Sequence, residues 1–157
     1  MKNLKLITIA ISLILLTGCG FKIIDKRELL NFNIKEISTN GDKRINFELK
    51  NKLSDYNDTN SSKVIKIELD TKKTKSIKEK NISNEITKYQ IKVVVNVKLI
   101  KTDNTNNLEF TIEREGDYVV ADKFSQTLNN EKKLIRNITE KISESIIGEI
   151  INKLNVI

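Results

Sequence analysis

Residues 89–99, with the sequence YQIKVVVNVKL, decide the fold. Apolar side chains occupy every second position of this stretch, and mostly polar ones stand between them: Tyr89, Ile91, Val93, Val95, Val97 and Leu99. A period of two puts the apolar set on one face of a β-strand. We therefore expect a strand with one buried face, the clearest strand in the sequence.

Three shorter stretches repeat this alternation on either side of this strand. They cover residues 30–34, 65–69 and 108–112, and the last can continue through Tyr118 and Val120. Residues 103–107, DNTNN, have the composition of a hairpin turn. Residues 70–83 are poor in apolar side chains, so we predict that the second strand ends near Asp70.

Two stretches change to a helical period. Ile45, Leu49 and Leu53 recur every four residues and predict a helix of about three turns. Residues from about 125 to 154 give the longest helical pattern, with apolar side chains again at four-residue intervals: Leu134, Ile138, Ile142, Ile146, Ile150 and Leu154. Gly148 interrupts that pattern, and we expect it to mark a site of close packing.

The order of these elements predicts the fold class. It reads β-α-β-β-β-α, which indicates an α+β fold. Two layers are the economical solution for two amphipathic helices and one short sheet. We expect a four-stranded sheet with both helices on one face.

The N-terminus carries the signature of secretion and lipidation. Lys2 and Lys5 precede an apolar run over residues 6–16, followed by Leu16-Thr17-Gly18-Cys19. A positive segment, a short apolar segment and a small residue make a signal peptide, and the run is shorter than the roughly 20 residues that span a bilayer. A Cys directly after the small residue resembles a bacterial lipobox. An ordinary signal peptide with a chance Cys is the alternative, but Cys19 is the only cysteine in the chain.

This interpretation divides the chain into three parts. Residues 1–18 are the signal peptide, 19–29 the lipidated N-terminus and tether, and 30–157 one domain. We expect a diacylglycerol and an N-acyl chain on Cys19, since stable anchoring takes more than one acyl chain. Gly20 follows Cys19 where the inner-membrane retention signal would have Asp, so the outer membrane is the expected location.

Catalytic motifs are missing from the sequence. It has no His, and its five glycines form no phosphate-binding or nucleophile-elbow motif. Glu113 and Glu115 share one strand face, which we interpret as solvated surface. We expect no enzyme, no cofactor and no metal site, and secretion argues against a nucleic-acid partner.

One basic cluster stands out between the second and third predicted strands. It contains five lysines opposed only by Glu79: Lys72, Lys73, Lys75, Lys78 and Lys80. These lysines can bind the phosphate groups of a glycolipid. The interpretation that we favour is that they protect an exposed strand edge against aggregation, because charge runs are usually solvated.

The chain as a whole resembles the LptE family, the lipopolysaccharide-assembly lipoproteins. The resemblance rests on four stretches in the right order: LTGCGF at residues 16–21, YQIKVVVNV at 89–97, REGDYVVAD at 114–122 and the terminal helix at 130–154. It implies an outer-membrane lipoprotein that joins an LptD-type β-barrel, aids assembly of that barrel, plugs its lumen and binds lipopolysaccharide.

The resemblance also indicates where glycolipid would bind. Basic residues of the family fall before the Tyr-containing strand and near the start of the last helix. The nearest basic residues here are Lys78, Lys80 and Lys132, which we take as candidates by position. A lipoprotein that serves as an adaptor for another envelope machine is the alternative function.

Overall fold

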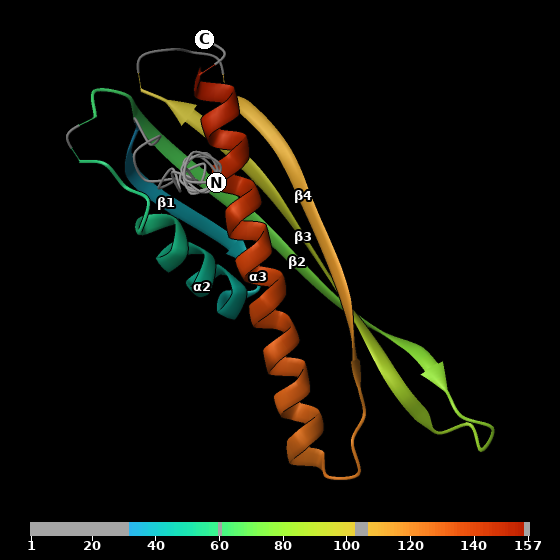
Figure 1. The fold of residues 1–157 in the computed structure, drawn as a ribbon. Coiled ribbons are helices and arrows are strands. Elements are labelled where there is room, and N and C mark those ends of the chain that lie inside the picture. Colours follow the sequence, from blue (N-terminus) through green and yellow to red (C-terminus); the bar gives the residue numbers. More distant parts are fainter. Residues whose placement is uncertain (1–31, 60, 103–106, 156–157) are drawn as a thin grey trace, which may run out of the picture.

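The computed structural model describes residues 32–59, 61–102 and 107–155 (Figure 1). The predicted signal peptide, Cys19, the tether and most of the turn at 103–107 lie outside the described residues. The elements follow the predicted order: β1 (Asn33–Gly41), α2 (Lys43–Ser54), β2 (Val64–Lys80), β3 (Ile86–Lys101), β4 (Leu108–Val119) and α3 (Phe124–Asn155).

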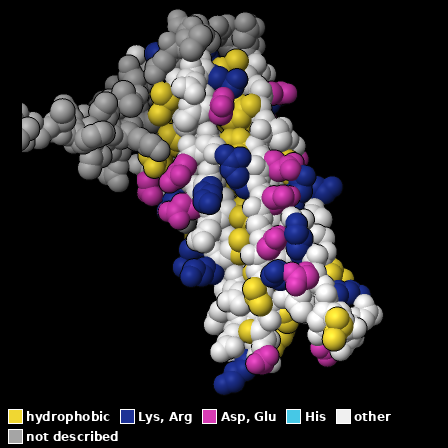
Figure 2. Space-filling view, turned by 45° about the vertical axis from the view of Figure 1, so that its right-hand side comes forward, with side chains coloured by type: hydrophobic (Ala, Val, Ile, Leu, Met, Phe, Trp, Pro, Cys, Tyr) yellow, Lys and Arg dark blue, Asp and Glu magenta, His cyan; other side chains and the backbone are white. Residues whose placement is uncertain are grey.

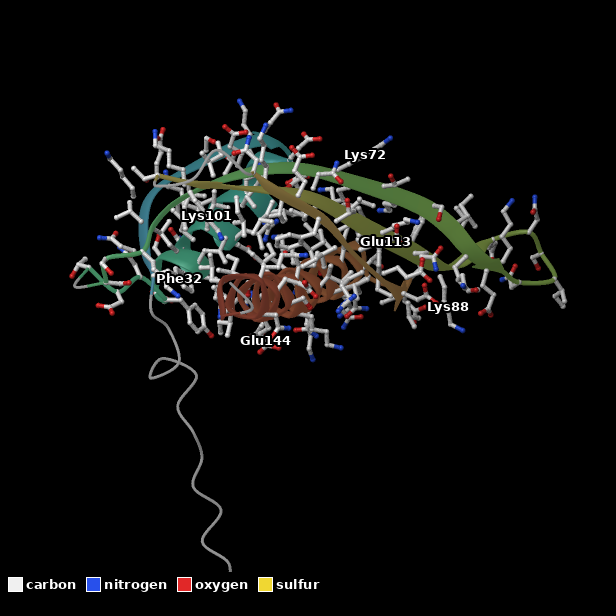
Figure 3. The ribbon with its side chains drawn as sticks, turned by 90° about the horizontal axis from the view of Figure 1, so that it is seen from above. Phe32, Lys72, Lys88, Lys101, Glu113 and Glu144 are labelled. Carbon is white, nitrogen blue, oxygen red and sulfur yellow. The ribbon has the colours of Figure 1, made fainter. Side chains whose placement is uncertain are left out.

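The strands form one mixed sheet in the order β1-β2-β3-β4. β1 pairs in parallel with β2, and the other neighbours are antiparallel. Both helices lie on the same face of the sheet, as the view in Figure 3 shows. The predicted α+β class, element order and placement of the helices are therefore confirmed.

The alternation seen in residues 89–99 creates the core. Every second side chain of β3 from Ile91 to Leu99 is at most 1% exposed, and Ile142, Ile146 and Ile150 of α3 are fully buried. Burying one such side chain contributes about 1.5–3 kcal/mol. The remaining side chains of β3 point to the opposite face, which no helix covers (Figure 3).

The junction between β1 and α2 depends on Gly41 and Asp42. Gly41 has a φ of +94°, and a Cβ atom there would lie 1.9 Å from the carbonyl oxygen of Thr71. Asp42 caps α2, because its side chain accepts hydrogen bonds from the backbone N–H groups of Arg44 (3.1 Å) and Ile45 (3.0 Å). Lys73 of β2 completes the cap with an ion pair to Asp42 at 2.9 Å.

β2 is longer than the sequence predicts. The expected end near Asp70 is wrong, because the strand continues to Lys80 in unbroken register with β3 as far as Ile77. β1 stops opposite Thr71, so beyond that point β2 pairs with β3 alone. Backbone hydrogen bonds to a strongly β-forming neighbour hold a strand that lacks its own apolar pattern. We call residues 72–92, which project beyond β1 in Figure 1, the distal arm.

Gly148 also departs from expectation. A Cβ atom at this position would meet no atom within 4 Å, so Gly148 faces open space and is not a site of close packing. It is half-buried and lines an open groove between α3 and β4, where no neighbour comes close enough to require a small residue.

The two glycines predict opposite responses to alanine. Gly148→Ala should raise the free energy of unfolding by up to about 1 kcal/mol, because alanine is the better helix former and meets no obstacle. Gly41→Ala should lower it by at least about 1–2 kcal/mol, since the residue would have to hold a left-handed backbone against Thr71. Urea denaturation followed by circular dichroism measures both. A loss of stability in Gly148→Ala would contradict the position assigned to this residue.

Candidate functional site: an amphipathic distal arm

A four-residue cluster fastens the distal arm to the start of α3. The ammonium of Lys75 is 2.7 Å from a carboxylate oxygen of Glu131, and the hydroxyl of Tyr118 donates to the same oxygen at 2.7 Å. The rings of Tyr89 and Tyr118 stack with centroids 5.7 Å apart. Lys75 also lies over the Tyr89 ring, 4.3 Å from its centroid. The cluster therefore joins β2, β3, β4 and α3.

The protonation equilibria of this cluster are coupled through Glu131. Burial alone would raise the pKa of Glu131, but hydrogen bonds from Lys75 and Tyr118 outweigh it and lower that pKa. Burial opposes the charge on Lys75, yet the contact with Glu131 leaves its pKa raised. The pKa of Tyr118 is raised by burial and by its hydrogen bond to Glu131. At neutral pH the cluster thus holds one carboxylate and one ammonium.

The five lysines of the basic cluster separate into two groups. Lys73 and Lys75 point toward the helices, where they pair with Asp42 and Glu131. Their role is structural, and hydrophobic periodicity in the sequence does not predict it. The structure places the whole run on a strand edge, as the edge interpretation requires.

Lys72, Lys78 and Lys80 are the lysines left to meet a ligand. Lys72 is exposed on the face opposite α3 (Figure 3). Lys78 is 4.0 Å from Asp117, with about half of its side chain exposed. Lys80 donates to the side chain of Asn84 in the turn at the tip of the arm, at 2.9 Å.

Lys132 stands apart from the other two glycolipid candidates. It is exposed on the first turns of α3. Below the cluster, α3 and the distal arm diverge (Figure 1). The structure thus places these lysines at the same end of the molecule without forming one pocket from them.

Exposed hydrophobic side chains gather at this end as well. Ile82 at the tip of the arm is fully exposed, Phe124 at the start of α3 is 81% exposed, and Ile77 is 52% exposed. Val119 and Leu128 add to the set. The sequence analysis missed these residues, although an isolated Ile in a polar run is an available signal. Apolar and basic groups together suit a lipid that carries phosphate.

The open face of the sheet offers a second surface of different character. A shallow polar groove of about 600 Å³ crosses all four strands, with Ser38, Glu68, Lys98 and Glu109 among its lining residues. Lys98 and Glu109 form an ion pair across it at 3.5 Å. Glu113 forms a similar ion pair with Lys92, in keeping with the predicted solvated surface.

The described residues show neither a metal-binding cluster nor a membrane-spanning helix. They contain no group of three or more His, Cys, Asp or Glu residues placed to hold a metal ion. None of the helices in this part of the chain has the length and apolar character needed to cross a membrane.

Comparison with solved structures identifies the fold. The chain is similar to rare lipoprotein B from Shewanella oneidensis, with a TM-score of 0.60 and 12% identity over 77% of this chain and 98% of that one. A Caulobacter crescentus protein assigned as a lipoprotein matches with a TM-score of 0.57 and 12% identity, over 83% of this chain and 94% of that one. At this identity the likeness shows a shared fold.

Comparisons of sequence add nothing further. No family profile matches the chain. No curated protein matches it either.

The cluster around Glu131 predicts a pH-dependent loss of stability. Glu131→Gln removes the carboxylate shared by Lys75 and Tyr118 and should lower the free energy of unfolding by about 1–2 kcal/mol at pH 7. Because the pKa of Glu131 is lowered in the folded protein, its contribution is present above 4.5 and disappears as the pH falls through the folded value. The raised pKa values of Lys75 and Tyr118 predict a second loss above about pH 10.

Urea denaturation at a series of pH values tests this prediction. Glu140→Gln is the matched control, since Glu140 on the same helix forms an ion pair with Lys52 in which both side chains are about half exposed. The control should change stability by less than about 1 kcal/mol. An equal effect of both substitutions, or a difference that does not diminish as the pH falls below 4.5, would refute the role given to Glu131.

Proposed function

We propose that this protein is an outer-membrane lipoprotein of the LptE type. Anchored through acyl chains on Cys19, it would join an LptD-type β-barrel and form with it the translocon that assembles lipopolysaccharide at the cell surface. It would help the barrel to assemble, plug its lumen and bind lipopolysaccharide. The role is one of binding and assembly and requires no catalytic step or cofactor.

One combination of observations carries the proposal. The lipobox-like Leu16-Thr17-Gly18-Cys19 precedes a domain with the fold of rare lipoprotein B. The likeness covers 98% of that chain, so it extends over nearly its whole length. A lipidated N-terminus and this fold together favour a protein held at the envelope membrane.

The surface of the sheet supports a place inside a barrel. Barrel lumens are polar, and the uncovered face of the sheet carries ion pairs such as Lys66–Glu36 and Lys98–Glu109. The helix side of the molecule, which the space-filling view shows, likewise carries interspersed acidic and basic side chains, with hydrophobic ones between them (Figure 2). Such a surface can meet a polar lumen wall without exposing a large apolar area.

The distal arm supports glycolipid binding. Lipopolysaccharide presents phosphate groups next to acyl chains. The arm presents Lys78 and Lys80 together with Ile77 and Ile82, and the start of α3 presents Lys132 and Phe124. The lysines would meet phosphate while the apolar side chains meet the upper part of the acyl chains.

Affinity purification tests the partner. A C-terminally tagged protein would be recovered from detergent-solubilised outer membranes, and the co-purifying proteins identified by mass spectrometry. The proposal predicts an LptD-like barrel in near-equal amount. Recovery of a different machine would favour the adaptor function instead, and recovery from the inner-membrane fraction alone would contradict the proposed location.

Charge reversal tests the glycolipid site. The triple variant Lys78→Glu, Lys80→Glu and Lys132→Glu should bind lipopolysaccharide at least about tenfold more weakly, a difference of about 1.4 kcal/mol. Its matched control reverses three exposed lysines on β1 and α2: Lys35, Lys43 and Lys50. Fluorescence titration with labelled lipopolysaccharide measures both. Equal loss in the two variants would show an effect of net charge only.

A further inference from the structure

The edge of β4 is uncovered, and its unused backbone groups can be assigned. The N–H of Val120 donates to Thr87 of β3, so residue 120 faces the sheet. Because successive residues of a strand direct their backbone groups to opposite sides, residue 119 and every second residue before it face outward. Two contacts agree with this assignment: the carbonyls of Glu113 and Val119 accept from the side chains of Arg114 and Asn130.

The remaining outward backbone groups belong to Glu109, Thr111, Glu115 and Asp117, together with the N–H groups of Glu113 and Val119. Within the described part of the chain, no backbone or side-chain group bonds them on that side. An uncovered edge of this kind is a template for an added strand.

A groove runs beside this edge, between β4 and α3. It has a volume of about 460 Å³, and Phe110 and Ile112 of β4 and Ser145, Glu149 and Asn152 of α3 are among its lining residues. A strand added to β4 would direct every second side chain toward α3 and hence into this groove. Binding between an edge strand and a helix is an established mode of peptide recognition.

The side chain of Arg114 occupies the groove beside the edge of β4. One guanidinium nitrogen donates to the carbonyl of Glu113 at 2.8 Å, and the other donates to the hydroxyl of Ser145 at 2.9 Å. The side chain thus satisfies one edge carbonyl and crosses the groove to α3. It is itself exposed, so an incoming strand can displace it.

The other face of β4 indicates the charge of the occupant. Four acidic side chains share that face: Glu109, Glu113, Glu115 and Asp117. Three of them already form ion pairs with lysines of β2 and β3, so Glu115 is the member of this row that has no ion pair among the described residues. A neighbouring strand with basic side chains on this face would complement the row.

We propose that the edge of β4 and the groove beside α3 bind an extended segment of a partner protein by strand addition. The segment would alternate β-branched polar residues such as Thr, whose methyl and hydroxyl groups suit the mixed lining of Phe110, Ser145 and Asn152, with Lys or Arg residues, which lie beside the acidic row. Its backbone would pair with the outward groups of β4 and displace Arg114. This inference does not depend on the proposed role in lipopolysaccharide assembly.

A designed peptide tests the proposal on the full-length chain in detergent. The probe is a fluorescein-labelled peptide with strictly alternating Lys and Thr, and its binding is followed by fluorescence anisotropy. We expect saturable binding by this peptide. A peptide of the same composition without alternation, and one with N-methyl groups on alternate amides, should each bind at least tenfold more weakly. Equal binding by the N-methylated peptide would overturn the proposal.

Variants of the protein locate the site. Ser145→Phe fills the groove, Glu115→Lys reverses one charge of the acidic row, and each should weaken binding at least tenfold. Glu144→Lys is the matched control, because Glu144 lies on the outer side of α3 (Figure 3), and it should change binding less than threefold. Arg114→Ala should tighten binding, since the groove and one carbonyl become accessible.

Two results would refute the inference. Equal weakening by Glu144→Lys and Glu115→Lys would reduce the interaction to net charge. Failure of both the wild type and Arg114→Ala to bind the alternating peptide would show that the edge accepts no strand. Analytical ultracentrifugation tests the alternative occupant, a second copy of this chain. Self-association that Ser145→Phe abolishes would assign the edge to that second copy and overturn the proposed partner.

Discussion

The antiparallel pairing of β2 with β3 is the interaction on which the other features depend. Its register runs without a shift from Ile65↔Lys101 to Ile77↔Tyr89. In the first half of this pairing, both strands direct aliphatic side chains toward the helices. In the second half the aliphatic side chains of β2 give way to lysines, and backbone hydrogen bonds to β3 keep the strand extended. The same ladder therefore supports the core at one end and the distal arm at the other.

A two-layer fold leaves much of its sheet available for contacts. Both helices cover one face of the sheet, so the opposite face is uncovered. The distal edge of β2 is uncovered too, as is the edge of β4 apart from the carbonyls of Glu113 and Val119. Each of these surfaces differs in chemistry. The open face is polar with ions of both signs, the distal arm combines lysines with exposed aliphatic side chains, and β4 carries an acidic row beside a groove. A protein that holds several partners at once could use all three.

The sequence predicted the parts of the fold that hydrophobic periodicity governs. The alternation in residues 89–99 and the four-residue spacing of Ile142, Ile146 and Ile150 identified the central strand and the long helix, because both patterns encode burial. Hydrophobic periodicity could not predict that β2 continues past Asp70, since backbone hydrogen bonds to β3 stabilise that segment. Nor could it identify Glu131 as the partner of Lys75, because the two residues meet only through the fold. The prediction that Gly148 marks close packing was wrong. A glycine in a helix indicates close packing only where a neighbouring element approaches its backbone, and the sequence alone does not show such an approach.

Amide hydrogen exchange in the distal arm tests most directly whether the sheet extends into it. The N–H groups of Lys72, Thr74 and Ser76 face β3, while those of Lys73, Lys75 and Ile77 face the uncovered edge. The account predicts slow exchange for the first set and fast exchange for the second, resolved residue by residue in NMR spectra of the labelled protein. Fast exchange throughout residues 72–80 would contradict it, since the arm would then be an unstructured loop.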